Sequence, residues 1–294
     1  MSLSRFFQSG ILPRVVGMMP SSVGRELFQI LGRAYYRLAD RREHRLIRRN
    51  VRDLLRTAWE RSAGDVTDEV FSGIYDHYFE KILLASKPTE YLERFLARRV
   101  ALVREDVIRR SLERGKGAIL VTAHWGAEEL IPVILYLRGY PVTVILDTAT
   151  DRLRGILEAR IEGRDIELLF ASDPQGVLSR IFDALARGRV LVTQCDEVDS
   201  WRRRKSRTIR LFGHTLFFDH TLDFIARKSG ASVAAVFCRR FPGLRYRMIC
   251  EEIALEGASE PGVSVRSLSI WERYTLEAPE QWHQWKKWEA MKAV

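Results

Sequence analysis

The chain has 294 residues, of which 46% are hydrophobic and 29% are charged, so it is not an intrinsically disordered protein and can bury a substantial core. No segment reaches the roughly 18 to 20 uninterrupted apolar residues that cross a bilayer, and the N-terminus lacks the compact apolar region of a signal peptide. Three widely separated cysteines predict neither a disulfide nor a zinc site. We therefore expect the protein in the cytoplasm or on the cytoplasmic face of a membrane.

The formal net charge of +10 indicates an anionic partner. Nucleic acid, anionic lipid head groups and an acidic carrier protein all fit, because each offers phosphates or carboxylates to arginine. Arginine is concentrated between Arg41 and Arg61 and again in the run from Arg202 to Lys205. The first stretch has a helical pattern and either binds anions or forms an ordinary solvated helix face. The second stretch follows a predicted strand, so we expect it at an edge of the sheet.

Residues 1–112 are predicted to be helical throughout, because apolar residues recur at intervals of three and four. One apolar stripe runs from Val23 to Leu38 and another from Val70 to Leu83. Ahead of them stand the apolar residues Phe6, Phe7, Ile11 and Leu12, flanked by Arg5 and Arg14, which fits either a helix in a membrane interface or a core helix. We expect this part of the chain to form a cap or platform.

From Gly115 onward, strand-like runs alternate with helical segments, which predicts an α/β fold with a mostly parallel central sheet flanked by helices. The predicted strands are 118–123, 142–146, 166–170, 190–194, 208–212, 232–237 and 245–253, and the predicted helices are 128–138, 151–163, 174–187, 220–229 and 265–276. We find no linker, repeat or low-complexity tract. We therefore expect one domain, residues 1–294, with an N-terminal helical layer over 1–112 and an α/β catalytic core over 115–294.

The segment His124-Trp125-Gly126-Ala127-Glu128-Glu129 directly follows the apolar strand 118–123. Open α/β sheets bind ligands at such junctions between a strand and a helix. Four residues separate His124 from Glu129, so the first helical turn can bring their side chains together. Glu129 would then accept one imidazole N–H and leave the other ring nitrogen free as a general base. The alternative is a buried histidine hydrogen-bonded to a chance glutamate.

Several motifs occur in an order and at separations that are fairly specific. They are Arg49-Asn50-Val51, Gly115 to Leu120, His124 to Glu129, Arg160, Asp196, Leu211-Phe212-Gly213, Ala226 to Ala231 and Pro279 to Trp282. With this set, the chain resembles the bacterial lipid A biosynthesis acyltransferases, the lauroyl and myristoyl transferases, and their relatives that acylate phosphatidylinositol mannosides. It departs from that pattern at Ala127 and Glu128, where relatives often have Asn and Trp. Many relatives also begin with a membrane-spanning segment.

The resemblance implies a glycerolipid acyltransferase-like fold and an activity that moves a fatty acyl chain to a hydroxyl of a glycolipid such as a lipid A precursor. The donor would be a thioester of acyl carrier protein or coenzyme A, with no bound cofactor and no metal. His124 would remove the acceptor's proton, and Glu129 would hold the imidazole and stabilise its charge. Arg160 would bind a lipid phosphate or the thioester oxygen, unless it is a surface arginine. Asp196 would bind an acceptor hydroxyl or orient an arginine, unless it caps a helix or forms a salt bridge.

The resemblance also implies attachment to the cell inner membrane. Because the membrane-spanning segment of many relatives is missing here, we expect this attachment to be peripheral, on the cytoplasmic face. Relatives also acylate other glycolipids or amino-acid lipids. Two other classes of function are weaker. A metal hydrolase is disfavoured because the remaining histidines, His44, His77, His214, His220 and His283, show no paired ligand spacing. A non-enzymatic membrane- or nucleic-acid-binding protein would explain the charge. Recognised RNA-binding motifs are absent, however, so we expect no nucleic-acid partner.

Overall fold

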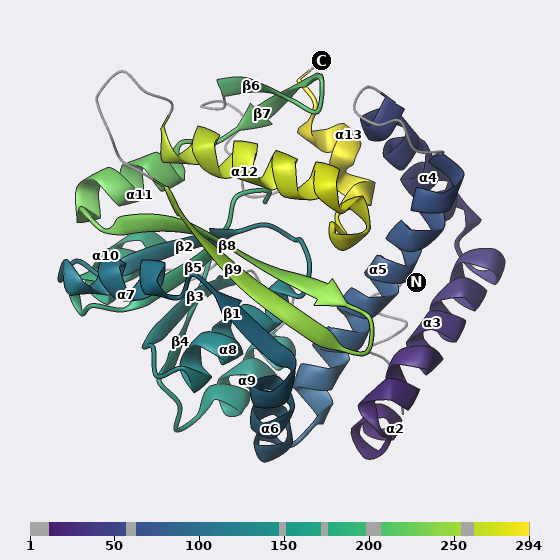
Figure 1. Ribbon diagram of the computed structural model, residues 1–294, viewed down its shortest axis with the longest axis horizontal. Coiled ribbons are helices and arrows are strands. Elements are labelled where there is room, and N and C mark those ends of the chain that lie inside the picture. Colours follow the sequence, from purple (N-terminus) through teal and green to yellow (C-terminus); the bar gives the residue numbers. More distant parts are fainter. Residues whose placement is uncertain are drawn as a thin grey trace.

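The computed structural model describes residues 12–56, 63–146, 151–171, 176–197, 207–253 and 262–293. Its first helices form a layer beside an α/β unit, with α5 nearest to the sheet (Figure 1). These helices are α2 (Leu12–Met18), α3 (Ser21–Leu38), α4 (Arg41–Arg56) and α5 (Ala63–Ser86). The predicted N-terminal helical layer is therefore present. Within the described ranges, no helix combines the length and the apolar character needed to cross a bilayer.

The α/β unit is built on a seven-stranded sheet with the order β1-β9-β8-β2-β5-β3-β4. Its strands are β1 (Val100–Val103), β2 (Ala118–Thr122), β3 (Val142–Leu146), β4 (Ile166–Phe170), β5 (Val190–Gln194), β8 (Ser232–Phe241) and β9 (Arg245–Ile253). Neighbouring strands are parallel except in the β8–β9 hairpin. Every residue of β2 is buried, as the continuous apolar run requires of a central parallel strand. The predicted fold class is confirmed.

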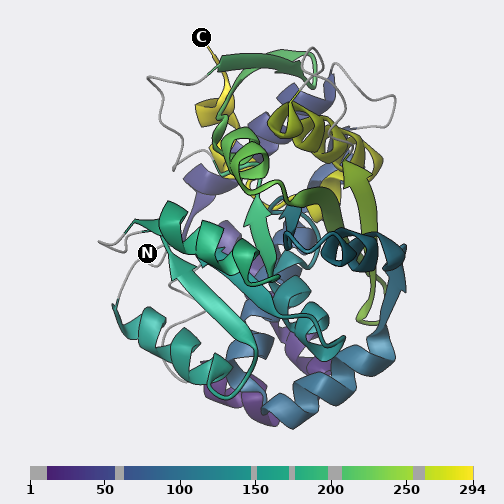
Figure 2. The same ribbon diagram turned by 90° about the vertical axis from the view of Figure 1, so that its left-hand side faces the viewer.

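Helices cover both faces of the sheet (Figure 2). They are α6 (Thr89–Arg99), α7 (Asp106–Glu113), α8 (Ile131–Leu137), α9 (Asp151–Ile161), α10 (Val177–Ala186), α11 (Thr221–Ser229) and α12 (Val263–Glu277). Short helical turns η1 (Glu128–Leu130), η3 (Pro279–Gln281) and η4 (Trp285–Lys287) and the helix α13 (Trp288–Met291) complete the chain. Because the parallel strands run in the same direction, their carboxyl ends lie at one common edge of the sheet, where open α/β sheets bind ligands.

Two segments differ from the sequence prediction. Strand β1 lies inside the region predicted to be helical throughout, and it pairs with β9 at the edge of the sheet. It is only four residues long and alternates between half-buried and exposed positions, a pattern too short to separate from the preceding helix. The predicted strand 208–212 does not extend the central sheet. It forms β6 (Arg207–Leu211), which turns back through Phe212 and Gly213, both with positive φ, and pairs with β7 (His214–Phe218).

The C-terminal segment is a tryptophan-rich part of the core. Trp271, Trp282, Trp285 and Trp288 are fully buried, and Trp282 packs edge-on against Trp285 with ring centroids 4.9 Å apart. Helix α5 touches this segment at Gly73, where an added Cβ would lie 1.8 Å from the carbonyl oxygen of Glu280. Only a glycine allows the backbone of η3 to lie this close to α5, which ties the helical layer to the end of the chain.

We predict that Gly73→Ala lowers the free energy of unfolding by about 1–3 kcal/mol, because the new methyl group overlaps a backbone oxygen that cannot easily move. The matched control is Gly155→Ala, which lies in α9 with no atom near its added Cβ and should stabilise the protein by about 0.5–1 kcal/mol through helix propensity. Urea denaturation monitored by circular dichroism measures both changes. Equal effects at the two positions would contradict the close approach of η3 to α5.

Candidate active site

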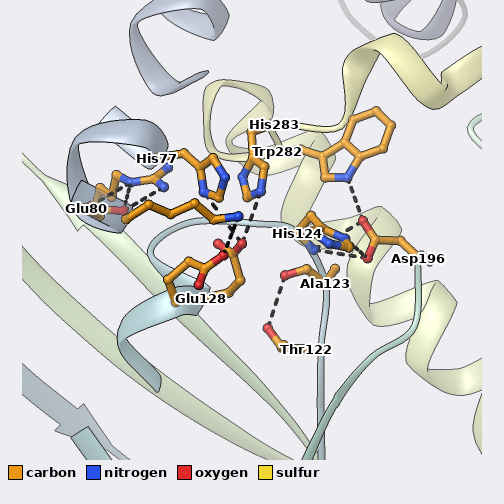
Figure 3. A network of polar contacts seen from close by, with 12 residues as sticks. His77, Glu80, Thr122, Ala123, His124, Glu128, Asp196, Trp282 and His283 are labelled. Atoms are coloured by element: carbon orange, nitrogen blue, oxygen red, sulfur yellow. Dashed lines mark hydrogen bonds and ion pairs between the residues drawn. The ribbon is translucent and has the colours of Figure 1, made fainter. Parts of the chain in front are cut away.

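The register of two neighbouring strands brings His124 to its partner. In the pairing of β2 with β5, Thr122 lies opposite Gln194. Parallel chains advance together, so two residues further along each chain His124 faces Asp196 at the carboxyl edge of the sheet. The Nδ1 atom of His124 lies 2.9 Å from Oδ1 of Asp196, and the backbone N–H of His124 donates to the same carboxylate at 3.0 Å (Figure 3).

Asp196 is completely buried and its carboxylate is held by the protein. Besides His124, it accepts a hydrogen bond from the indole Nε1 of Trp282 at 2.8 Å. Burial alone would raise the pKa of Asp196, but the charge of His124 and these hydrogen bonds outweigh it and hold that pKa below its usual value. The sequence predicted a contact between Asp196 and an acceptor hydroxyl. The carboxylate is instead closed off from solvent and contacts the imidazole of His124.

His124 is a nearly buried base with one ring nitrogen free of Asp196. Burial lowers the pKa of His124, but the charge and hydrogen bond of Asp196, together with the charges of Glu128 and Glu197, raise it to about 9. The Nε2 atom lies 3.5 Å from Oε2 of Glu197, beyond ordinary hydrogen-bond distance, and 14% of the side chain is exposed. Asp196 therefore fixes the ring orientation through Nδ1, and Nε2 is the ring nitrogen that a substrate could reach.

Glu129 does not make the predicted contact with the imidazole. Its carboxylate pairs instead with Nζ of Lys81 on α5 at 2.9 Å, and both side chains are about one third exposed. The reason is local: Gly126 takes a positive φ and the backbone N–H of Ala127 donates to the carbonyl of Cys238, so the continuous helix begins only at Ile131. Glu129 lies in the short turn before that helix, and Asp196 occupies the ring nitrogen that Glu129 was expected to hold.

Arg160 also lies elsewhere than the sequence indicated. It belongs to the last turn of α9, which runs back from the carboxyl end of β3 toward the start of β4, away from the edge that carries His124. Its guanidinium donates to the backbone carbonyls of Lys87, at 2.7 Å, and Ala85, where it satisfies the end of α5. A role for Arg160 in substrate binding stays a prediction. The run from Arg202 to Lys205 lies outside the described residues.

A second cluster beside His124 went unnoticed in the sequence. His77 on α5, Glu128 in η1 and His283 after η3 are all buried, and their ligand-type atoms lie within 4.8 Å of one another (Figure 3). The rings of His77 and His283 are stacked 3.6 Å apart, and the ring of His283 packs edge-on against that of His124. No local spacing could reveal this cluster. Its one signal was Glu128, where relatives often have another residue.

The carboxyl edge also carries an apolar cavity of about 560 Å³. Its walls come from the ends of β3 and β5 and from α10, α11 and α12, and they include Ile145, Ile181, Leu222, Phe224 and Leu268. Cys195 and Glu197 also line it, and Glu197 is the residue that faces Nε2 of His124. The cavity therefore opens beside the free nitrogen of the base.

A parallel α/β sheet with a histidine–aspartate pair at its carboxyl edge, next to an apolar cavity, is typical of an enzyme that acts on an apolar substrate. Comparison with protein families places the chain within that class: the bacterial lipid A biosynthesis acyltransferase family matches residues 4–288. The chain belongs to this family and is an acyltransferase of the lipid A biosynthesis type. A comparison with curated proteins found no match.

We predict that kcat/KM falls as the pH drops through about 9, because His124 must be neutral to accept a proton. The Asp196 carboxylate favours the imidazolium, so Asp196→Asn should lower the pKa of His124 and shift the fall in kcat/KM to lower pH. The same change should reduce the maximal rate at high pH by about 10²–10⁴. The pH–rate profile of acyl transfer measures both effects. Glu129→Gln is the matched control and should not change the pH at which kcat/KM falls. If Glu129→Gln shifted that pH and Asp196→Asn did not, the orienting role would belong to Glu129.

Proposed function

We propose that the protein transfers a fatty acyl chain from a thioester to a hydroxyl of a membrane glycolipid such as a lipid A precursor, with His124 as the general base. The observation that supports this most directly is the His124–Asp196 pair at 2.9 Å beside a cavity with mainly apolar walls. Nε2 of His124 removes the hydroxyl proton as that oxygen attacks the thioester carbonyl. The carbon–sulfur bond then breaks, and the imidazolium returns the proton to the departing thiolate.

The roles of the carboxylates follow from their contacts. Asp196 is a positioning residue, because it touches the imidazole and is closed off from substrate. The catalytic role of Glu129 that the family resemblance implies would have to act through charge, since Glu129 is paired with Lys81. General-base catalysis contributes about 10²–10⁴-fold to a rate, so removal of the base at His124 should abolish most of the transfer.

The cavity is suited to the acyl chain of the donor. Each methylene group that leaves water for such a site contributes about 0.8 kcal/mol, so a long chain can bind by burial alone. The donor would be acyl carrier protein or acyl coenzyme A, whose acidic or phosphate groups match the net charge of +10. No bound cofactor is needed for this chemistry, because the thioester itself supplies the activated carbonyl.

We predict that Leu222→Trp, which fills the cavity, shifts donor preference toward shorter acyl chains by at least about tenfold, since a lost stretch of buried chain costs more than 1.4 kcal/mol. The measurement is transfer of label from a series of acyl carrier protein thioesters to a lipid extract. The matched control is Leu137→Trp, a half-buried leucine of α8 that does not line the cavity, and it should leave the preference unchanged. An unchanged chain-length preference in Leu222→Trp would show that the acyl chain does not bind in this cavity.

We propose peripheral attachment to the cytoplasmic face of the inner membrane through the outer face of α2 and α3. Four large apolar side chains are at least half exposed there: Met18, Val23, Ile30 and Leu38. Arg33 and Arg37 are exposed on α3 beside Ile30, and α4 adds further arginines. Apolar side chains with basic neighbours are typical of helices in a membrane interface. Phe6, Phe7 and Ile11 lie outside the described residues, whereas Leu12 packs against the core.

The double variant Ile30→Glu with Leu38→Glu should lose most binding to vesicles that contain anionic lipid, because two buried contacts become charges of the wrong sign. High salt should also weaken binding of the unmodified protein, since each basic residue near such a surface contributes about 1 kcal/mol. Vesicle flotation measures both. Val103→Glu, an exposed apolar residue on β1, is the control and should bind normally. Binding that tolerates both the double variant and salt would exclude this face.

A further inference from the structure

Among the described residues, one buried carboxylate beside the catalytic base, that of Glu128, forms no ion pair with a lysine or arginine. Around it, charges are matched in pairs: Asp196 with His124, Glu80 with Arg240 at 2.8 Å, and Glu129 with Lys81 at 2.9 Å. Glu128 is also buried, with 3% of its side chain exposed, but its neighbours are the imidazoles of His77 and His283. An ionised carboxylate without a partner is costly to bury, so a cation bound at this place would stabilise the charged form of Glu128.

The polar atoms of these three residues converge without bonding to one another. Nε2 of His283 lies 3.1 Å from Oε1 of Glu128, and Nδ1 of His77 lies 3.6 Å from the same oxygen. In the described part of the chain, none of these three atoms has a hydrogen-bond partner, and neither has Oε2 of Glu128. These nitrogen and oxygen atoms are close together but do not form hydrogen bonds with one another. Ligands that share one metal ion have this arrangement.

We propose that His77, Glu128 and His283 bind a divalent transition metal ion, with Zn²⁺ the best match. Two imidazoles and one carboxylate form a nitrogen- and oxygen-rich site of the kind that Zn²⁺ and its neighbours in the first transition row prefer. The separations of 3.1 and 3.6 Å are close to those between ligands about 2.0–2.2 Å from a common tetrahedral ion. The two rings are stacked 3.6 Å apart in this structure, so metal binding would move them apart, with both side-chain torsions of each histidine adjusting until both lone pairs point at the ion.

The ion would complete the charge balance and stiffen the surroundings of the base. It supplies the cation that Glu128 lacks and fixes His283, whose ring packs edge-on against His124 at a centroid distance of 5.6 Å. It also links α5, the turn η1 and the C-terminal segment, which are the three elements that carry its ligands. This site is independent of the proposed acyl transfer, because its evidence is the geometry of its own ligands.

The test uses the full-length protein, stripped of metal with a chelator and then titrated with Co²⁺, whose visible spectrum reports its ligands. We expect one equivalent to bind, Zn²⁺ to displace it and the melting temperature to rise with either ion. Glu128→Gln and His283→Gln should lose this binding. The matched control, His220→Gln, removes a histidine that lies 2.9 Å from the Asp223 carboxylate outside the cluster, and it should bind normally.

X-ray absorption of the Zn²⁺-loaded unmodified protein gives an answer that does not depend on the folding of the variants. It should show two imidazole nitrogens and a carboxylate oxygen at about 2.0–2.2 Å from the metal. Failure of the stripped protein to bind either ion would overturn the proposal. So would binding that survives in both Glu128→Gln and His283→Gln, or a coordination shell without imidazole, because each places the metal elsewhere.

Discussion

The buried carboxylate of Asp196 is the interaction on which the arrangement of the site depends. It accepts hydrogen bonds from His124 at the end of β2 and from Trp282 near the C-terminus, and it is itself fixed by β5. A charge without exposure to water needs every one of these donors, so the three segments must come together as the protein folds. The backbone reinforces this: the N–H of His283 donates to the carbonyl of His124, and that of Gly126 donates to the carbonyl of Gln281.

The N-terminal helices are a wall of the site rather than a separate cap. Helix α5 places His77, Glu80 and Lys81 beside the turn that follows β2, where Lys81 neutralises Glu129 and Glu80 pairs with Arg240 of β8. Burial raises the pKa of Glu80 to about 7 even with the opposing charge of Arg240, so this buried pair is costly to form. Moving α5 away would leave a buried charge without its partner, which holds α5 in its position. The close approach at Gly73 sets the distance at which these side chains meet the C-terminal segment.

In the proposed acyl transfer, the imidazole of His124, held in one orientation, and the apolar cavity at the same sheet edge would have separate roles. The cavity would bind the part of the substrate that does not react, through burial that requires no directional contacts. The His124–Asp196 pair would act on the proton that moves, with the imidazole held by a hydrogen bond that allows little freedom. Because Glu197 borders both, the reacting carbonyl and the start of the acyl chain can lie next to each other.

The sequence by itself determined the local features: strands β3, β4, β5 and β9 have the predicted bounds, because apolar runs, the alternation of polar and apolar residues in β9 and the turns around them are properties of neighbouring residues. It also placed His124 correctly at the end of β2. It could not identify Asp196 as the partner of His124, since the two are 72 residues apart and meet only through the register of β2 with β5. The same holds for His77, Glu128 and His283, which converge only when α5 and the C-terminal segment pack against the sheet. Side-chain partners were decided by tertiary structure because hydrogen bonds and charges act over a few ångströms of space, whatever the distance along the chain.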